Sequence, residues 1–162
     1  MSKQQLDRLD KRILELITQN ARIPFLEVAR ECNVSGAAIH QRVQKLMNTG
    51  VIKGSEFVID NYKVGYQTCA LIGIVLRDLK FFNNVVEEIK KIPEVVECHY
   101  ATGKYAMFVK VYAKTNRHLL SIILEKLTVI SGVATTETFQ ISLDEIFKRP
   151  ITVFDFPDSE NL

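Results

Sequence analysis

One segment near the amino terminus carries side chains suited to contact the edges of nucleic-acid bases. A helix that buries Ile39, Val43 and Leu46 turns by about 100° per residue, which leaves a small, amide-rich stripe on its opposite side. A glutamine amide offers a donor and an acceptor side by side, as the edge of an adenine requires. The stripe and its flanks predict a DNA-contacting set: Ser35, Ala37, Ala38, His40, Gln41, Arg42, Gln44 and Lys45.

Each kind of residue in this set has its own expected contact. The two alanines let the start of the helix come close to a base pair, and the two glutamines pair with base edges. Lys45 or Arg42 meets a phosphate. Ser35 and the free N–H groups of the first helical turn form a further phosphate site. Amide-rich helices also occur on ordinary protein surfaces, so the interpretation depends on the surrounding elements.

The distribution of charge along the chain supports that interpretation better than the net charge does. The formal net charge is only +2, which is too small to indicate a nucleic-acid binder by itself. Residues 1–60 hold 9 basic and 7 acidic side chains, whereas the rest of the chain holds 12 of each. No acidic side chain lies between Glu31 and Glu56. The excess positive charge therefore belongs to the first part of the chain.

The sequence shows no pattern typical of catalysis or of a bound cofactor. Cys32, Cys69 and Cys98 are widely spaced and lack metal-ligand spacing, so we expect buried, small apolar side chains in a reducing cytoplasm. No phosphate loop or nucleophile-base pair is present, and we predict neither cofactor nor metal. No signal peptide or apolar run of about 20 residues occurs, which favours a cytoplasmic protein without a membrane partner.

Three short helices are expected to position the DNA-contacting set. Apolar spacing and the N-cap Asp7 predict a helix over residues 7–20. Pro24 suits the first turn of a second helix, which ends before a tight turn at residues 33–34. Ser35 caps a third helix, which stops at an Asn-Thr-Gly sequence. Two helices joined by so brief a turn predict a helix-turn-helix.

The second part of the chain contains an internal repeat with an offset of 38 residues. Leu71 matches Val109, for example, and Ile89 matches Leu127. Each copy predicts a strand, a helix and a strand, and the copies together predict a ferredoxin-like βαββαβ domain. The strands are expected over residues 67–76, 95–101, 105–113 and 133–142, and the helices over 79–92 and 116–128.

Both faces of the predicted sheet are apolar. In the first strand, apolar residues occupy both the odd-numbered and the even-numbered positions. The third strand places Phe108 and Tyr112 on the face opposite to that of Met107 and Val109. An antiparallel sheet with helices on one face needs a cover for a second apolar face. A two-fold homodimer supplies that cover with identical surfaces.

These elements and several short motifs resemble the Lrp/AsnC, or feast/famine, family of transcription regulators. The match runs in order, with matching spacings, over residues 6–143. In the first half the matching residues are Leu6, Asp7, Asp10, Ile13, Leu14, Asn20, Ala21, Arg22, Val34, Ser35, Arg42, Val43, Lys45, Leu46, Gly50, Val51, Ile52 and Lys53. In the second half they are Ile92, Pro93, Glu94, Val95, Thr102, Gly103, Lys104, Tyr105, Gly132, Val133, Thr136, Glu137 and Thr138.

The resemblance implies a dimer, often assembled further into a tetramer or octamer, that binds double-stranded DNA and responds to an amino acid or related metabolite. It places the small-molecule effector between dimers, near the hairpin after the second strand. Family members that bind amino acids commonly have aspartate where Ala106 stands, so an effector's ammonium group lacks that partner here. The effector residues carried over are Gly103, Lys104, Tyr105, Ala106, Thr136 and Thr138.

We therefore predict an α+β protein that is a sequence-specific transcription regulator and not an enzyme. A (winged) helix-turn-helix domain is joined to a ferredoxin-like effector and oligomerisation domain. The segment at 51–59 is expected to be a strand-like wing or connector. The predicted parts are residues 1–60 for DNA binding, 61–66 as linker, 67–148 for effector binding and oligomerisation, and 149–162 as a carboxy-terminal arm.

The sequence also allows two alternatives to a DNA-binding regulator. Siroheme decarboxylases share the two-domain fold and use histidines on a tetrapyrrole, and this chain has His40, His99 and His118. The third hypothesis is a metabolite-sensing partner protein whose helix-turn-helix does not bind DNA. The salt dependence of DNA binding separates this last hypothesis from the first, because phosphate contacts release counterions.

Overall fold

The computed structural model describes residues 5–143 and 146–151 of the 162-residue chain. The chain divides into two compact units, Met1–Val58 and Ile59–Ile146, and residues 147–151 are grouped with the first. Most of the predicted arm at 149–162 lies outside the described residues. Within the part described, no helix is long and apolar enough to cross a membrane.

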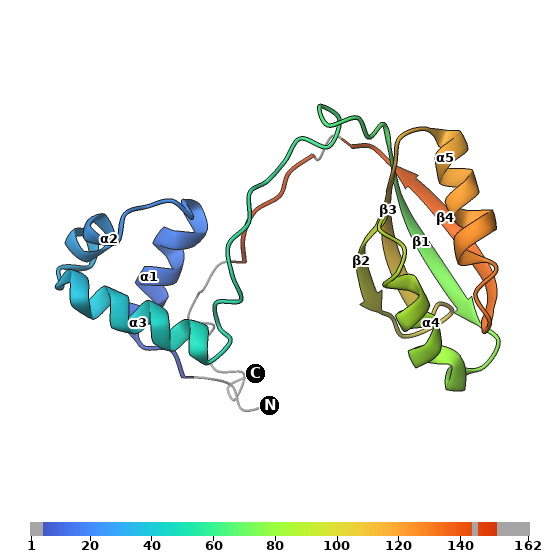
Figure 1. Ribbon diagram of the computed structural model, residues 1–162. Coiled ribbons are helices and arrows are strands. Elements are labelled where there is room, and N and C mark those ends of the chain that lie inside the picture. The colour runs from blue at the N-terminus through green and yellow to red at the C-terminus, as the bar shows by residue number, and fades with distance from the viewer. Residues whose placement is uncertain (1–4, 144–145, 152–162) are drawn as a thin grey trace, which may run out of the picture. The chain divides into compact units, whose positions relative to one another are not determined.

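The first unit holds three short helices, α1 (Arg8–Gln19), α2 (Phe25–Cys32) and α3 (Gly36–Asn48) (Figure 1). Asp7 and Ser35 cap α1 and α3, each accepting a hydrogen bond from the backbone N–H three residues later. Pro24 is the N-cap of α2 and not a residue of its first turn. Asn33 ends α2 in the left-handed conformation, with φ of 54°. These caps confirm the predicted helix-turn-helix.

The core of the first unit fixes the inner side of α3. Ile39 and Val43 of α3 pack with Ile13 of α1 and with Val28 and Ala29 of α2. All five side chains are buried, and burial of each large aliphatic side chain contributes about 1.5–3 kcal/mol. The opposite side of α3 consequently faces away from the core.

The segment after α3, expected to be a strand-like wing or a connector, does not form a strand. Residues 53–60 adopt neither helix nor strand, and Phe57 and Val58 are exposed. Within the first unit, the Arg22 guanidinium lies 4.6 Å from the centre of the Phe57 ring. A strand needs a hydrogen-bonded partner, and no pairing is found for this segment among the described residues. The segment is therefore a connector.

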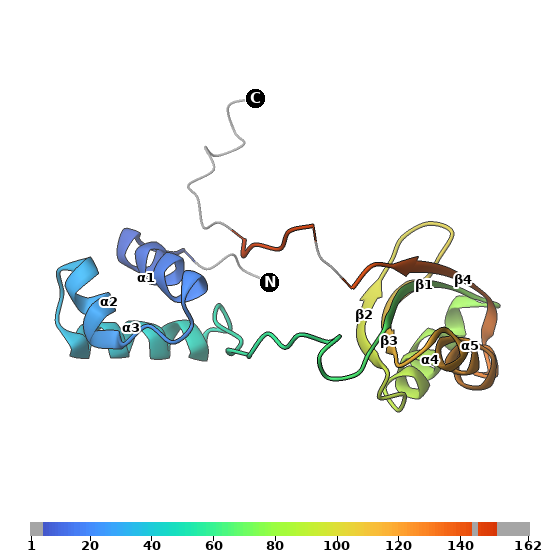
Figure 2. The same ribbon diagram turned by 90° about the horizontal axis from the view of Figure 1, so that it is seen from above.

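The second unit is a four-stranded antiparallel sheet with the order β2-β3-β1-β4. Figure 1 and Figure 2 both show the helices on the same side of this sheet. This arrangement confirms the predicted ferredoxin-like βαββαβ domain. The strands are β1 (Thr68–Leu76), β2 (Val95–Tyr100), β3 (Met107–Ala113) and β4 (Val133–Ile141).

Each predicted helix of this unit consists of two consecutive helical pieces. The first is the 3₁₀ turn η1 (Leu79–Phe81) followed by α4 (Phe82–Ile89), and the second is α5 (Asn116–Ser121) followed by the π-helical η2 (Ile122–Leu127). Their apolar sides pack on the sheet. Val85 and Ile89 of α4, for example, share a core with Ile72 and Ile74 of β1.

The other side of the sheet, called the open face below, is largely apolar, as predicted. Residues paired across an antiparallel ladder share a face, and the register places Leu71 of β1 beside Phe139 of β4. The other apolar residues of the open face are Cys69, Val75, Phe108, Tyr112 and Ile141.

The prediction that the three cysteines are buried is only partly right. Cys69 is buried, Cys32 is half-buried and Cys98 is exposed on the edge strand β2. An edge strand has a neighbour on one side only, so an apolar residue type there gains less cover than in a central strand. All three cysteines are free thiols.

Candidate functional sites

The outer side of α3 forms a shallow groove in the first unit. Four of the predicted DNA-contacting residues line this groove, namely His40, Gln41, Gln44 and Lys45. Gln41, Gln44 and Lys45 are exposed there. Its lining residues are His40, Gln41, Gln44, Lys45, Asn48 and Thr49.

The groove side chains differ in whether they already contact other side chains of the protein. The Gln44 amide donates to Asn48 Oδ1 at 3.0 Å. The His40 ring stacks edge-to-face on Phe25 of α2, with ring centres 5.0 Å apart, which restrains His40 to the edge of the groove. The Lys45 ammonium forms no ion pair with a described residue and is available to an external anion.

The start of α3 retains unused hydrogen-bond donors. Ser35 Oγ accepts the Ala38 N–H at 3.2 Å, so its own hydroxyl proton remains free to donate. The first N–H groups of a helix have no partner within the helix, and Ala37 leaves them uncovered because its side chain is one methyl group. This end of α3 is therefore suited to bind a phosphate.

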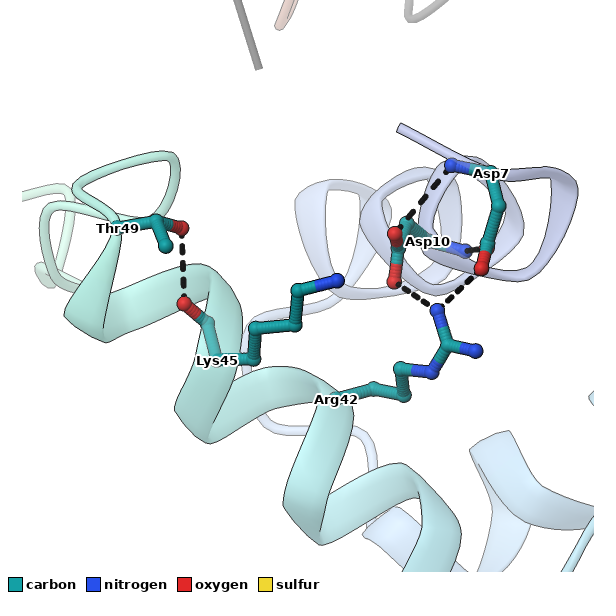
Figure 3. Close-up of polar contacts among 5 residues, drawn as sticks. All are labelled: Asp7, Asp10, Arg42, Lys45 and Thr49. Atoms are coloured by element: carbon teal, nitrogen blue, oxygen red, sulfur yellow. Dashed lines mark hydrogen bonds and ion pairs between the residues drawn. The ribbon is translucent and has the colours of Figure 1, made fainter. Parts of the chain in front are cut away.

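Arg42, which the sequence offers beside Lys45 as a possible phosphate ligand, is bonded to side chains of the first unit. Its Nη1 atom donates to Asp10 Oδ1 at 3.0 Å and to Asp7 Oδ2 (Figure 3). Asp7 and Asp10 also form a capping box at the start of α1, each accepting the other's backbone N–H. Arg42 thus connects α3 to the first turn of α1, and its guanidinium is already engaged by two carboxylates.

These contacts shift the ionisation of the groups involved. The Asp10 backbone N–H and then the Arg42 guanidinium hold the pKa of Asp7 below its usual value. Hydrogen bonds to Asp7 and Asp10 raise the pKa of Arg42. Both shifts favour the ionised forms of Asp7 and Arg42.

The predicted effector residues lie in two groups in the second unit. The hairpin between β2 and β3 carries Lys104 and Tyr105, and both reach Glu137 of β4. Lys104 Nζ lies 2.6 Å from Glu137 Oε2, and the Tyr105 hydroxyl donates to the same oxygen. The Lys104 ammonium is the main cause of the lowered pKa of Glu137, and Glu137 in turn raises the pKa of Lys104.

Glu137 was missed by sequence reasoning, which selected its neighbours Thr136 and Thr138. The register pairs these threonines with Ile74 and Ile72, whose side chains face the helices. Glu137 pairs with Gly73 and so shares the open face with the hairpin residues. Successive side chains of a strand point to opposite faces, and this alternation distinguishes Glu137 from the two threonines.

Glycine is required at position 73 by the ring of Tyr105. A Cβ atom added at Gly73 would lie 2.6 Å from Tyr105 Cδ1, closer than any normal contact. Tyr105 also packs against Phe108, with ring centres 4.9 Å apart. The Ala106 N–H donates to the Ile74 carbonyl at 2.9 Å, which secures the hairpin to β1. Gly103 has φ of 124°, as a tight hairpin requires.

The three histidines occupy separate environments. His40 stacks on Phe25 in the first unit, and His99 lies 3.1 Å from Glu97 on β2. His118 lies in the first turn of α5, whose N-cap is Thr115, and its Nδ1 accepts the Lys114 N–H. No group of three potential metal ligands comes together in the part of the chain that the structure describes.

Comparisons with known proteins agree with this arrangement in both units. Residues 6–53 match a winged helix-turn-helix DNA-binding family, and residues 69–151 match the Lrp/AsnC ligand binding domain. The regulatory protein AsnC of Haemophilus influenzae is 39% identical over 146 residues, which cover 90% of this chain and 97% of that protein. AsnC of Escherichia coli is 31% identical and covers 91% of this chain and 97% of its own length.

Solved structures have the same fold. Escherichia coli AsnC superposes with a TM-score of 0.84 at 32% identity and covers 92% of this chain and 99% of that chain. A transcriptional regulator from Neisseria meningitidis, solved in complex with L-Met, has a TM-score of 0.82 at 20% identity and covers 90% and 94%. The matched domains and the extent of identity show that this chain belongs to the Lrp/AsnC family of transcription regulators.

Proposed function

We propose that this regulator recognises its DNA sites through the outer side of α3. The observation that carries the proposal is the exposed groove in which two amide side chains lie together with a lysine that has no ion-pair partner among the described residues. Gln41 and Gln44 contact base edges in the major groove, with Ala37 and Ala38 allowing close approach. Lys45 and the start of α3 at Ser35 bind phosphates.

Substitution of single groove residues separates these roles. Gln41→Ala is expected to weaken binding to the specific site about tenfold or more, because a bidentate base contact contributes roughly 1–3 kcal/mol, and to leave non-specific binding nearly unchanged. Lys45→Ala is expected to weaken both equally and to reduce the salt slope of binding by about 1 for each subunit. Fluorescence anisotropy over a salt series measures both quantities.

A matched control removes a glutamine outside the groove. Gln19→Ala, at the end of α1, should leave both affinities unchanged. Equal losses of specific and non-specific affinity in Gln41→Ala would refute its contact with a base. Wild-type binding that is absent or independent of salt would favour the alternative of a metabolite-sensing partner protein.

We further propose that the open face is the surface of a homodimer, which assembles into a tetramer or octamer. Phe139 and Ile141 are 44% and 38% exposed in the single subunit, beside half-buried Leu71 and Phe108. A second copy related by a two-fold axis covers this surface with its own equivalent residues. The dimer then presents two α3 helices to two half-sites.

A fragment that begins at residue 62 is expected to remain at least dimeric. The second unit has its own core, and the open face lies entirely within it. Sedimentation velocity of this fragment measures the assembly directly. A monomer at micromolar concentration would contradict the assignment of the interface to the sheet.

The hairpin residues support binding of a small anionic or zwitterionic effector. We propose Gly103, Lys104, Tyr105 and Ala106 as its contacts, with Lys104 binding the effector's carboxylate in place of Glu137. Thr136 and Thr138 remain candidates only for an effector that also reaches the helix side of β4. An amino acid fits this chemistry, and the Neisseria meningitidis relative was solved with L-Met.

A thermal-shift screen of amino acids and related metabolites tests the effector site. A ligand at 100 times its Kd should stabilise the protein by about 2.7 kcal/mol. Lys104→Gln is expected to abolish that shift. Lys126→Gln is the matched control, since Lys126 forms an equally close ion pair, 2.7 Å from Glu94, on the helix side of the sheet. Loss of the shift in both variants would argue against a specific role for Lys104.

We infer that the protein is not an enzyme of the siroheme decarboxylase type. His99 lies on the open face and His118 on the helix side, so the two imidazoles cannot act on one tetrapyrrole in a single subunit. Incubation with a haem precursor should yield no product. Turnover by protein that ignores DNA would reverse this inference.

A further inference from the structure

Asp10 is a buried charged residue in the first unit. Its side chain is only 2% exposed, although it lies in the first turn of α1. A buried carboxylate loses the hydration that stabilises its charge, so it requires a cation or several hydrogen-bond donors. The Arg42 guanidinium contacts Oδ1, and the Asp7 backbone N–H donates to Oδ2 at 3.3 Å. A residue of α3 thus satisfies a buried charge on α1.

The charge of this cluster makes Arg42 a poor ligand for DNA. Asp7, Asp10 and Arg42 together carry two negative charges and one positive charge. Figure 3 shows the Arg42 guanidinium reaching from α3 to the two carboxylates, whereas Lys45, one turn later, has no dashed contact to its ammonium. The Asp7 side chain is 50% exposed, so a phosphate that approaches Arg42 also meets this carboxylate. Attraction by Arg42 and repulsion by the aspartates oppose each other.

The same contacts give α3 a defined orientation. Its apolar residues Ile39, Val43 and Leu46 hold it against the core, but apolar burial has little directional preference. A guanidinium bonded to two carboxylates is directional, since its donors must point at both. Arg42 follows Gln41 directly in the sequence, so the rotation of α3 that satisfies Arg42 also determines where Gln41 points.

We propose that Arg42 is a positioning residue for DNA recognition. Its ion pairs with Asp7 and Asp10 fix the rotation of α3 on α1, and Gln41 and Gln44 reach base edges only in that orientation. This inference rests on the proposed function of α3. Arg42 thus contributes to sequence specificity without contacting DNA, although its charge alone would suggest a phosphate contact.

The salt dependence of binding distinguishes a positioning role from a phosphate contact. Arg42→Gln is expected to lower affinity for the specific duplex about tenfold, to change affinity for an unrelated duplex by less than about twofold, and to leave the salt slope unchanged. Lys45→Gln is the matched control, and it should lower both affinities and reduce the slope by about 1 for each subunit. Arg42→Lys, which keeps one ion pair, should recover part of the specificity.

A second variant keeps the proposal testable if Arg42→Gln fails to fold. Asp7→Asn preserves the helix cap, since asparagine caps as well as aspartate, but removes an ion-pair partner of Arg42. We expect the ratio of specific to non-specific affinity to fall about threefold or more at an unchanged salt slope. An unchanged or increased ratio would overturn the proposal, as would a reduced slope in Arg42→Gln.

The controls also separate failure of this inference from failure of the proposed function. If Gln41→Ala keeps full specificity, α3 does not contact bases through Gln41, and the proposed function fails there. If Gln41→Ala loses specificity while Arg42→Gln and Asp7→Asn retain it, α3 contacts bases and only the positioning role is wrong. Circular dichroism of each variant confirms that the helices are intact.

Discussion

Phe139→Asp is expected to convert the proposed dimer into monomers, with a loss of roughly 100-fold or more in the affinity between subunits, or about 2.7 kcal/mol. Phe139 is 44% exposed in the single subunit, so aspartate there costs little in folding. In the dimer the same carboxylate is buried without a cation, and the two-fold axis places a copy on each subunit. Analytical ultracentrifugation over a concentration series measures the dissociation constant.

The matched control places the same charge on the helix side of the domain. Leu120 of α5 is 54% exposed, and Leu120→Asp should leave the dimer intact. A full operator has two half-sites, which one dimer can bind at the same time. Phe139→Asp should therefore also weaken binding to a full operator but leave binding to a single half-site unchanged. A Phe139→Asp protein that remains dimeric would show that subunits do not meet through the open face.

Gly132→Ala is expected to destabilise the second unit by about 3 kcal/mol or more. Gly132 has φ of 104°, a conformation that costs other residues roughly 1–3 kcal/mol. An added Cβ would also lie 2.4 Å from Phe81 Cβ, so the connection between η1 and the rest of the domain must shift. Thermal unfolding followed by circular dichroism gives the change in stability.

Gly103→Ala separates the two contributions in that prediction. Gly103 also has a positive φ, of 124°, but no atom lies within 4 Å of an added Cβ. Its substitution should therefore cost only the backbone strain. Similar losses of stability at the two positions would mean that Phe81 moves aside at no cost in free energy.

The sequence predicted helices and strands well where local signals agree with the tertiary fold. Asp7 and Ser35 are caps in sequence and in structure, because an N-cap acts on a backbone group three residues away. The repeat at an offset of 38 residues predicted the strand-helix-strand units, because each unit buries the same apolar pattern. For residues 51–59 the sequence left a strand-like wing or a connector open, and no strand forms there because alternation alone supplies no partner strand.

The functional side chains were harder to predict, since their partners are distant in the chain. Arg42 stands 35 and 32 positions from Asp7 and Asp10, and Glu137 lies 33 from Lys104. A helical wheel shows which side of α3 is exposed, but it does not show that an arginine at the margin of that side bends back to another helix. Residue type favoured a phosphate contact for Arg42, and the structure adds that its guanidinium is bonded to the buried carboxylate of Asp10.

The ring of Tyr105 over Gly73 has a thermodynamic consequence. The ring belongs to the proposed effector site and, at the same time, forms part of the surface that a second subunit would cover. A ligand that displaces Tyr105 therefore reshapes that surface. By linkage, such a ligand must change the affinity between subunits by the same factor by which dimerisation changes the affinity for the ligand.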